Sequence, residues 1–357
     1  MKTDLPRDSE RPVERQLSRR WLGMVLILGG LGWLLFELLI RGTIAGIDLN
    51  LARSDSVQRI AEQRFIVKRV EVVGVNDQVV LIGTTDDEVV LRGERRGFGW
   101  AANAAADAAT KIELQIEQRG DTLYINVKHP QWAPWSFGRN PYAYLELALP
   151  SDVTFEVSLV SGDATLRQVA ARGTITTING EVRAEGTTGQ LTLNTTSGDV
   201  TLSDHRSEIN FLTVSGDLSA SGLLGAVIAQ TTSGDVKLSG VRGPVQVTTV
   251  SGDVDIASDE AVRLAIDTTG GDITFSGRLA AGEQHVSTIS GDVQLTLLPP
   301  FDVQLNFRTI GGKIDAPAGL AAQVSNARSL QTMLGDGRSL LNVEATSGNI
   351  TLRLAEQ

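Results

Sequence analysis

The second half of the chain alternates apolar and polar positions in short runs that recur at a fixed interval. Apolar pairs lie two and four residues after a central Gly, as at Val200 and Leu202, and seven and five residues before it, as at Leu191 and Leu193. Alternation of period two turns one face of a strand inward and the other outward. Each repeat is therefore predicted to form two short strands joined at corners that contain Gly.

The central Gly recurs every 18 residues through its first six copies and at longer intervals afterwards. A unit of this size cannot bury its own apolar face, whereas stacked units cover one another. Residues 151–357 are therefore predicted to form a β-solenoid of about ten rungs at a spacing of ~4.8 Å. An antiparallel meander is the alternative, and the constant repeat length favours the solenoid. The copies are Gly162, Gly180, Gly198, Gly216, Gly234, Gly252, Gly271, Gly291, Gly312 and Gly348.

A Ser-Gly-Asp triplet, as in TTSGDV at 195–200, occupies most of these corners. Gly permits the positive φ that a tight corner needs, and Ser and Asp can bond local backbone amides. Gly is the most constant member, which favours a structural corner over a binding site. Stacked carboxylates about 4.8 Å apart would repel by roughly 1 kcal/mol per pair in water, so a calcium ion between rungs is the alternative. The candidate ligands are Asp199, Asp217, Asp235, Asp253, Asp272 and Asp292.

A Thr column stands three residues before the corner Gly in most repeats. Its parity with the apolar positions predicts that these side chains point inward and form a structural hydroxyl ladder, each Thr bonding the next. The members are Thr177, Thr195, Thr213, Thr231, Thr249, Thr268, Thr288 and Thr309.

Residues 57–150 are predicted to form a small β region without repeats, because runs such as VKRVEVVGV are rich in β-branched residues and bounded by Gly or Asp. The Ala-rich segment Ala101–Lys111 is the one predicted helix of this region. A Pro- and Gly-rich loop within 129–144 gathers large aromatic side chains. This loop is predicted either to cap the open end of the solenoid or to form an interaction surface. The aromatic residues are Trp132, Trp135, Phe137, Tyr142 and Tyr144.

The N-terminal part predicts a membrane anchor. Residues 1–20 form a polar tail rich in Arg, and residues 21–40 form an apolar run long enough to cross a hydrocarbon core as a helix. Residues 41–56 are predicted to be a linker. The excess of basic residues before the run predicts a cytoplasmic N-terminus and an extracytoplasmic repeat region in the cell membrane. A cleaved signal peptide is the alternative.

Composition narrows the classes of function. The formal net charge of −10 argues against a nucleic-acid partner. The chain has no Cys and only three His, and none of the His belongs to a recognised catalytic motif. We therefore expect no enzymatic activity and, calcium aside, no cofactor; a glycan-active enzyme is the least favoured alternative.

The chain resembles the bacterial putative-adhesin β-strand-repeat family, a domain of unknown function, over residues 57–356. The resemblance rests on VEVVGVNDQVVLIG, on LELALPSDVTFEVSLVSGDATL, on the serial TTSGDV units and on the closing MLGDGRSLLNVEATSGNITLRL. It implies a non-catalytic, envelope-associated repeat domain, and it supplies no catalytic or ligand residues. Some members of this family resemble parts of envelope-stress signalling systems.

These observations predict an envelope-anchored protein that presents an acidic solenoid for adhesion, scaffolding or partner binding. The expected partners are the membrane and either envelope proteins or a surface glycan, and self-association through open solenoid ends is a further expectation. A regulatory or sensor module of an envelope-stress pathway is the alternative function.

Overall fold

The computed structural model describes residues 43–44, 47–48, 54–99, 102–130, 140–321 and 323–355. The chain divides into two compact units, Met1–Arg53 and Ser54–Gln357. In the first unit, β1 (Thr43–Ile44) pairs antiparallel with β2 (Ile47–Asp48). The predicted tail and apolar run at 1–40 lie outside the described residues. In the portion that the structure describes, helices are too short or too polar to span a bilayer.

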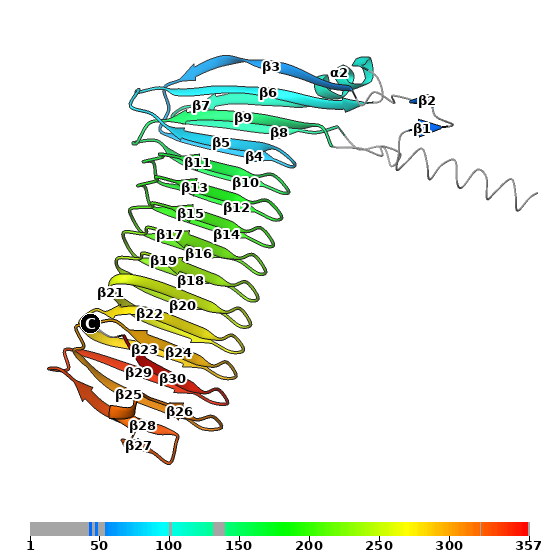
Figure 1. Cartoon of the computed structure of the whole chain (residues 1–357). Coiled ribbons are helices and arrows are strands. Elements are labelled where there is room, and N and C mark those ends of the chain that lie inside the picture. The colour runs from blue at the N-terminus through cyan, green and yellow to red at the C-terminus, as the bar shows by residue number, and fades with distance from the viewer. Residues whose placement is uncertain are drawn as a thin grey trace, which may run out of the picture. The chain divides into compact units, whose positions relative to one another are not determined.

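The second unit is a stack of rungs, each of which contributes one strand to each of two facing sheets (Figure 1). Successive rungs pair in parallel and in register, with Leu193 opposite Phe211 and Val200 opposite Leu218. The 18-residue period of the sequence is therefore the offset between hydrogen-bonded neighbours. The predicted β-solenoid is confirmed, and parallel pairing excludes the meander for these rungs.

The strands before the corner form one sheet. They are β10 (Thr154–Leu159), β12 (Gly173–Thr177), β14 (Leu191–Thr195), β16 (Ile209–Leu212), β18 (Val227–Gln230), β20 (Pro244–Thr248), β23 (Gly282–Thr288), β25 (Val303–Thr309) and β29 (Ser339–Ala345). The strands after the corner form the other sheet. They are β11 (Ala164–Arg167), β13 (Val182–Glu185), β15 (Val200–Ser203), β17 (Leu218–Ser221), β19 (Val236–Ser239), β22 (Ile273–Leu279), β24 (Val293–Leu297), β26 (Ile314–Asp315) and β30 (Ile350–Leu354). The long strand β21 (Val254–Thr268) pairs in both sheets.

The inward positions of both sheets fill one continuous apolar core. Alternate residues of each rung are almost fully buried, and Phe211, Phe275 and Phe307 are the largest of them. Burial of this apolar surface drives the stacking, because each rung covers its neighbours and leaves only the two terminal rungs to be capped.

The N-terminal strands extend the stack and cap it. Strands β4 (Arg69–Gly74) and β5 (Gln78–Gly83) pair in parallel with β10 and β11, so rung geometry begins before residue 151. The remaining strands are β3 (Ser54–Phe65), β6 (Val89–Gly99), β7 (Glu113–Arg119), β8 (Thr122–Lys128) and β9 (Tyr142–Leu149). Helix α2 (Ala102–Thr110) confirms the predicted helix and packs on β6, where a Cβ on Gly97 would meet the Ala105 carbonyl oxygen at 2.1 Å.

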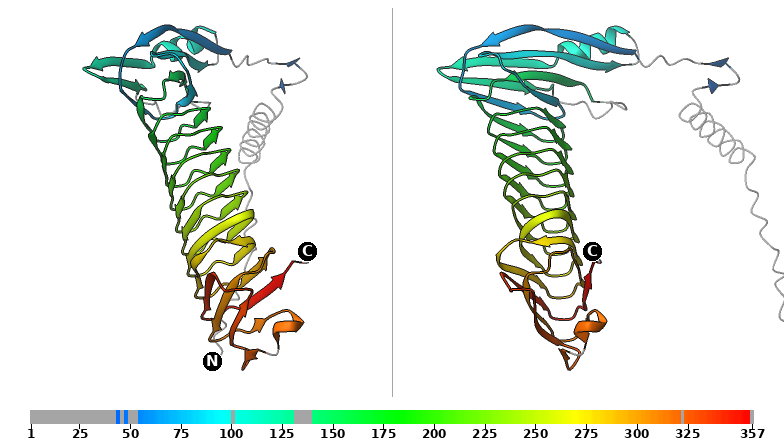
Figure 2. Two further views of the ribbon diagram at one scale, coloured as in Figure 1. Left: turned by 90° about the vertical axis from the view of Figure 1, so that its left-hand side faces the viewer. Right: turned by 60° about the vertical axis from the view of Figure 1, so that its left-hand side comes forward.

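The C-terminal rung does not follow chain order. Strands β29 and β30 are inserted between β23–β24 and β25–β26, with parallel neighbours on both sides. At this end of the stack, β28 (Ser329–Leu334) pairs antiparallel with β25 and β27 (Val324–Ser325), and the short helix α3 (Ala318–Ala321) lies in the chain between β26 and β27 (Figure 2). The serial stacking expected from the sequence therefore fails at the last two rungs, whose spatial order is reversed.

Candidate functional site

The corner glycines are required by close backbone approach. A Cβ on Gly234 would lie 1.9 Å from the carbonyl oxygen of Gly216, and each other corner Gly from Gly180 on would meet the Gly of the preceding rung at 1.7–2.0 Å. None of the ten adopts a positive φ. The corner interpretation of the triplet is therefore supported, but positive φ was the wrong reason for it. Positive φ belongs to the opposite corner, for example at Gly186 and Gly222.

The Thr column is buried as predicted, but it does not form a ladder of Thr-to-Thr bonds. Within a rung, the Thr231 Oγ1 accepts a hydrogen bond from the Gly234 amide at 2.9 Å, and the other seven members of the Thr column repeat this contact at 2.7–3.1 Å. The corner Gly amide is buried and has no partner in either sheet. The Thr hydroxyl accepts its hydrogen bond, so the free-energy cost of a buried, unpaired N–H is avoided. The predicted ladder was thus wrong about the partner.

The six candidate calcium ligands form a ladder of another kind. Oδ1 of each carboxylate accepts a hydrogen bond from the backbone amide of the next rung, at 2.7–3.0 Å. In the last contact the donor is Asn349, which occupies the Asp position of the inserted rung. Each contact places a carboxylate against an amide dipole and so offsets part of the repulsion along the column. The six residues are Asp199, Asp217, Asp235, Asp253, Asp272 and Asp292.

Among the residues that the structure describes, no three His, Asp or Glu side chains are grouped as a metal ion would need. The Asp carboxylates lie in single file, with one oxygen of each engaged by the backbone. Calcium takes six to eight oxygen ligands, and this column would supply few of them to any one ion. Calcium binding by the column stays a prediction.

The opposite corner buries a polar pair. His205 and Thr187 are both fully buried, and Thr187 Oγ1 lies 2.8 Å from His205 Nδ1. The next two rungs place Leu223 and Val241 at the same position, where both are buried. Burial lowers the pKa of His205, and a hydrogen bond with the Glu208 carbonyl only partly opposes this effect. The imidazole is therefore held neutral inside the core.

A second buried polar pair joins the cap to the first rung. The Asp77 carboxylate has no exposed surface, and both of its oxygens lie 3.0 Å from His129 Nε2. The carboxylate also accepts the Ala143 amide at 2.8 Å and the Val75 amide at 3.0 Å. These contacts tie the starts of β5 and β9 to the end of β8. Asp77 therefore acts as a structural junction.

The candidate aromatic surface is described only in part. Trp132, Trp135 and Phe137 lie in 131–139, outside the described residues. Tyr142 and Tyr144 lie on β9, where both are half-buried. The ring of Tyr142 is 6.1 Å from that of Phe98. Burial, reinforced by the charge of Glu146, raises the pKa of Tyr144. These two tyrosines are packed against the cap, and the choice between cap and interaction surface stays open for the other three.

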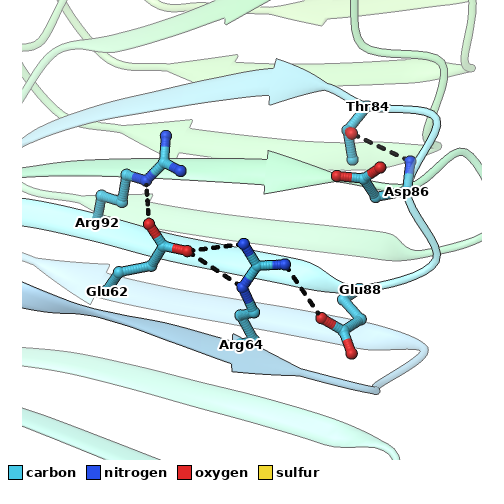
Figure 3. A network of polar contacts seen from close by, with 6 residues as sticks. All are labelled: Glu62, Arg64, Thr84, Asp86, Glu88 and Arg92. Carbon is cyan, nitrogen blue, oxygen red and sulfur yellow. Dashed lines mark hydrogen bonds and ion pairs between the residues drawn. The ribbon is translucent and has the colours of Figure 1, made fainter.

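Charged pairs cover the outer face of the cap. Figure 3 shows Glu62 between Arg64 and Arg92, each at 2.9 Å, and Arg64 also lies 3.6 Å from Glu88. Hydrogen bonds from Arg92 and Arg64 lower the pKa of Glu62. Because these groups are exposed, such pairs add little to stability. Charge on the terminal strand β3 does disfavour pairing with the edge of another sheet, which argues against self-association at this end.

The described histidines do not form a catalytic triad. His129 contacts Asp77, His205 contacts Thr187, and His285 lies 3.2 Å from the exposed Asp267. Within the described ranges, no His contacts both a carboxylate and a hydroxyl, as a Ser-His-Asp triad requires.

Comparison with known proteins identifies the repeat. The family model described as Toastrack DUF4097 matches residues 151–242 and 205–353. Together these matches span residues 151–353, which is 203 of the chain's 357 residues. The match confirms the resemblance that the serial TTSGDV units carry. No curated protein matches the chain at a significant level.

Three solved structures are similar over most of their length. A putative cell adhesion protein from Clostridium sporogenes is 11% identical, with 85% of this chain and 100% of that chain covered and a TM-score of 0.23. A putative lipid binding protein from Parabacteroides distasonis is 15% identical, with 84% and 96% covered and a TM-score of 0.37. A putative adhesin from Bacteroides fragilis is 13% identical, with 84% and 98% covered and a TM-score of 0.26. Similarity at this level carries no inference about ligands.

Proposed function

We propose a binding function for this chain, which belongs to the Toastrack DUF4097 family: it presents its solenoid at the cell envelope for adhesion, scaffolding or partner binding, without catalysis. The family match covers the rungs from residue 151 on, so the proposal concerns the surface that these rungs repeat. The apolar run at 21–40 supports an anchor in the cell membrane, with the solenoid on the extracytoplasmic side.

The observation that carries the proposal is the regularity of the outer surface. The same outward columns recur from rung to rung, with Ser before the corner Gly and Asp after it, while the apolar positions are committed to the core. A repeated set of weak contacts binds an extended or repetitive partner with high avidity, because each contact after the first is intramolecular. A catalytic site needs instead a single place that differs from the rest.

The test uses intact cells that make the full-length chain, beside cells that lack it. Protease added outside should digest the solenoid while a cytoplasmic control protein survives, and cells with the chain should attach better to surfaces or to other cells. The protease is also added to cells whose outer layer has been made permeable while the cytoplasmic membrane stays intact. If the solenoid still resists digestion there, its extracytoplasmic placement is refuted. Unchanged attachment, together with crosslinking to a small fixed set of membrane proteins, would favour the sensor function.

A further inference from the structure

An exposed column of β-branched side chains runs along the Ser-Gly-Asp corner. It consists of the residue two positions before each corner Gly and its counterpart Val75 in the first rung. Every member is exposed, and the Val and Ile members expose 40–59% of their surface. We call this column the corner ridge. In spatial order it comprises Val75, Val160, Ile178, Thr196, Val214, Thr232, Val250, Thr269, Ile289, Thr346 and Ile310.

The spatial order follows from hydrogen bonds between rungs. The amide that follows each ridge residue donates to the ridge carbonyl of the preceding rung, as from Ser233 to Val214 at 2.9 Å and from Ser347 to Ile289 at 2.8 Å. Gly311 donates in the same way to Thr346 at 2.7 Å. The rung of Thr346 therefore lies between those of Ile289 and Ile310.

Apolar and Thr residues alternate strictly along the ridge from Ile178 to Ile310. In sequence order the alternation breaks, because Ile289 and Ile310 both precede Thr346. The insertion of β29–β30 restores it in space. An apolar side chain thus recurs every two rungs, or about 10 Å. Because an exposed position does not need this order for folding, the alternation points to a ligand of the same period.

The ridge offers side chains rather than an open strand edge. From Val75 to Thr346 its carbonyls accept the amide that follows the next ridge residue, so these groups are not available to a peptide that adds as a strand. What it presents is methyl groups, Thr hydroxyls and an adjoining column of exposed Ser hydroxyls, with the Asp ladder beyond. That set of groups suits a polyhydroxyl ligand with apolar faces. The Ser members are Ser161, Ser197, Ser215, Ser233, Ser251, Ser290 and Ser347.

We propose that the corner ridge binds a linear β-1,4-linked glycan, neutral or positively charged, laid along the stack with one sugar per rung. Successive rings of such a polymer are turned over relative to each other, so one side repeats every two sugars, as the ridge does every two rungs. The Val and Ile methyls contact the CH groups, and Thr and Ser exchange hydrogen bonds with the hydroxyls. The Asp ladder repels polyanions. This inference rests on the proposed function and names its ligand class.

Calorimetry on the purified full-length chain tests it, with cellohexaose and the deacetylated glucosamine hexamer as probes. Both should bind, and their dimers should bind far more weakly, because each rung adds one contact. A uronic acid hexamer should not bind. The double variant Val214→Ser/Val250→Ser should weaken hexamer binding by about tenfold or more. Ile66→Ser and Met333→Ser, which change apolar residues that lie away from the ridge and are more exposed than Val214 and Val250, should leave it unchanged.

Two further arms make the outcome decisive. Thr232→Val keeps the β-branched shape but places three apolar residues in succession, so it should weaken glycan binding; tighter binding would overturn the match of periods. A lysine hexamer should not bind in place of the sugar hexamers. If lysine and sugar hexamers bind equally, and the ridge variants change neither affinity, binding is due to the charge of the Asp ladder and the ridge is not the site. If cell attachment depends on the chain while no hexamer binds, the ligand class is wrong and the binding function stands.

Discussion

The corner glycines can be tested at one pair of neighbours, Gly270 and Gly271. A Cβ on Gly271 would lie 1.9 Å from the carbonyl oxygen of Gly252, whereas ordinary contact begins near 3.4 Å. The two rungs must therefore separate locally by 3.4 − 1.9 = 1.5 Å. A Cβ on Gly270 meets only the Val250 carbonyl oxygen, at 3.5 Å, and most other rungs carry Ser at this position. The substitutions Gly271→Ala and Gly270→Ala thus differ only in whether the rungs can stay in contact.

The cost of Gly271→Ala follows from what the separation breaks. The bonds at risk are those from the Asp272 amide to Asp253 Oδ1 and from the Gly270 amide to the Val250 carbonyl, both 2.8 Å long. Two such bonds contribute about 1–3 kcal/mol together. Overpacking of a closely packed site adds roughly 1–3 kcal/mol. We therefore expect Gly271→Ala to lower the free energy of unfolding by about 2–6 kcal/mol.

Denaturant unfolding of both variants, followed by far-ultraviolet circular dichroism, measures the difference. Hydrogen exchange at the amides of 270–273 shows whether the loss is local, as nearest-neighbour coupling in a repeat protein predicts. Gly270→Ala should unfold within about 0.5 kcal/mol of the wild type. If the two variants unfold alike, close backbone approach is not what the corner glycines provide.

Three more outcomes follow from the corners. Because burial holds the pKa of His205 below its unfolded value of about 6.5, the unfolded chain binds the proton first, and stability should fall as pH drops below about 6.5; His205→Leu should remove this part of the pH dependence, and an unchanged profile would contradict the assignment. Thr231→Val leaves the buried Gly234 amide unpaired and should cost about 1–3 kcal/mol, whereas Thr231→Ser should cost less in the same denaturant titration. Asp235→Ala should cost about 1 kcal/mol because the Asp253 amide loses its acceptor, while Asp235→Asn keeps the acceptor and should match the wild type; equal losses would rule out the ladder.

The strands and the stacking of each rung could be predicted from the sequence, but the reason for Gly at its corner could not. Alternation around each Gly predicted two strands, and the constant interval predicted parallel stacking, because each follows from which residues face the core. The reason for Gly could not be inferred in the same way. Positive φ is a property of one residue, whereas the contact of Gly234 with Gly216 belongs to two rungs at once and is visible only when both are placed.

The order of the last rungs was also beyond the sequence. The units around Gly312 and Gly348 carry equivalent apolar pairs, so either can stack on the unit of Gly291. The antiparallel pairing of β25 with β28 occupies the far edge of β25 and leaves its near edge to β29. The order of the last two rungs therefore depends on contacts between segments far apart in the sequence. The alternation of apolar and Thr residues along the corner ridge depends on this order. The candidate ridge was therefore missed, although seven of its residues stand directly before the Ser of a corner triplet.

The inserted rung gives folding a direction that the repeat alone lacks. A solenoid can add units in the order in which they leave the ribosome or a translocation channel, and up to β24 this chain can do so. The block from β25 to β28 cannot take its final place then, because the rung that separates it from β24 is made later. The growing end must stay open, with unpaired strand edges that favour aggregation, until β29 and β30 arrive. Closure is thus a single late event, in which one short segment pairs on both sides and fixes everything synthesised just before it.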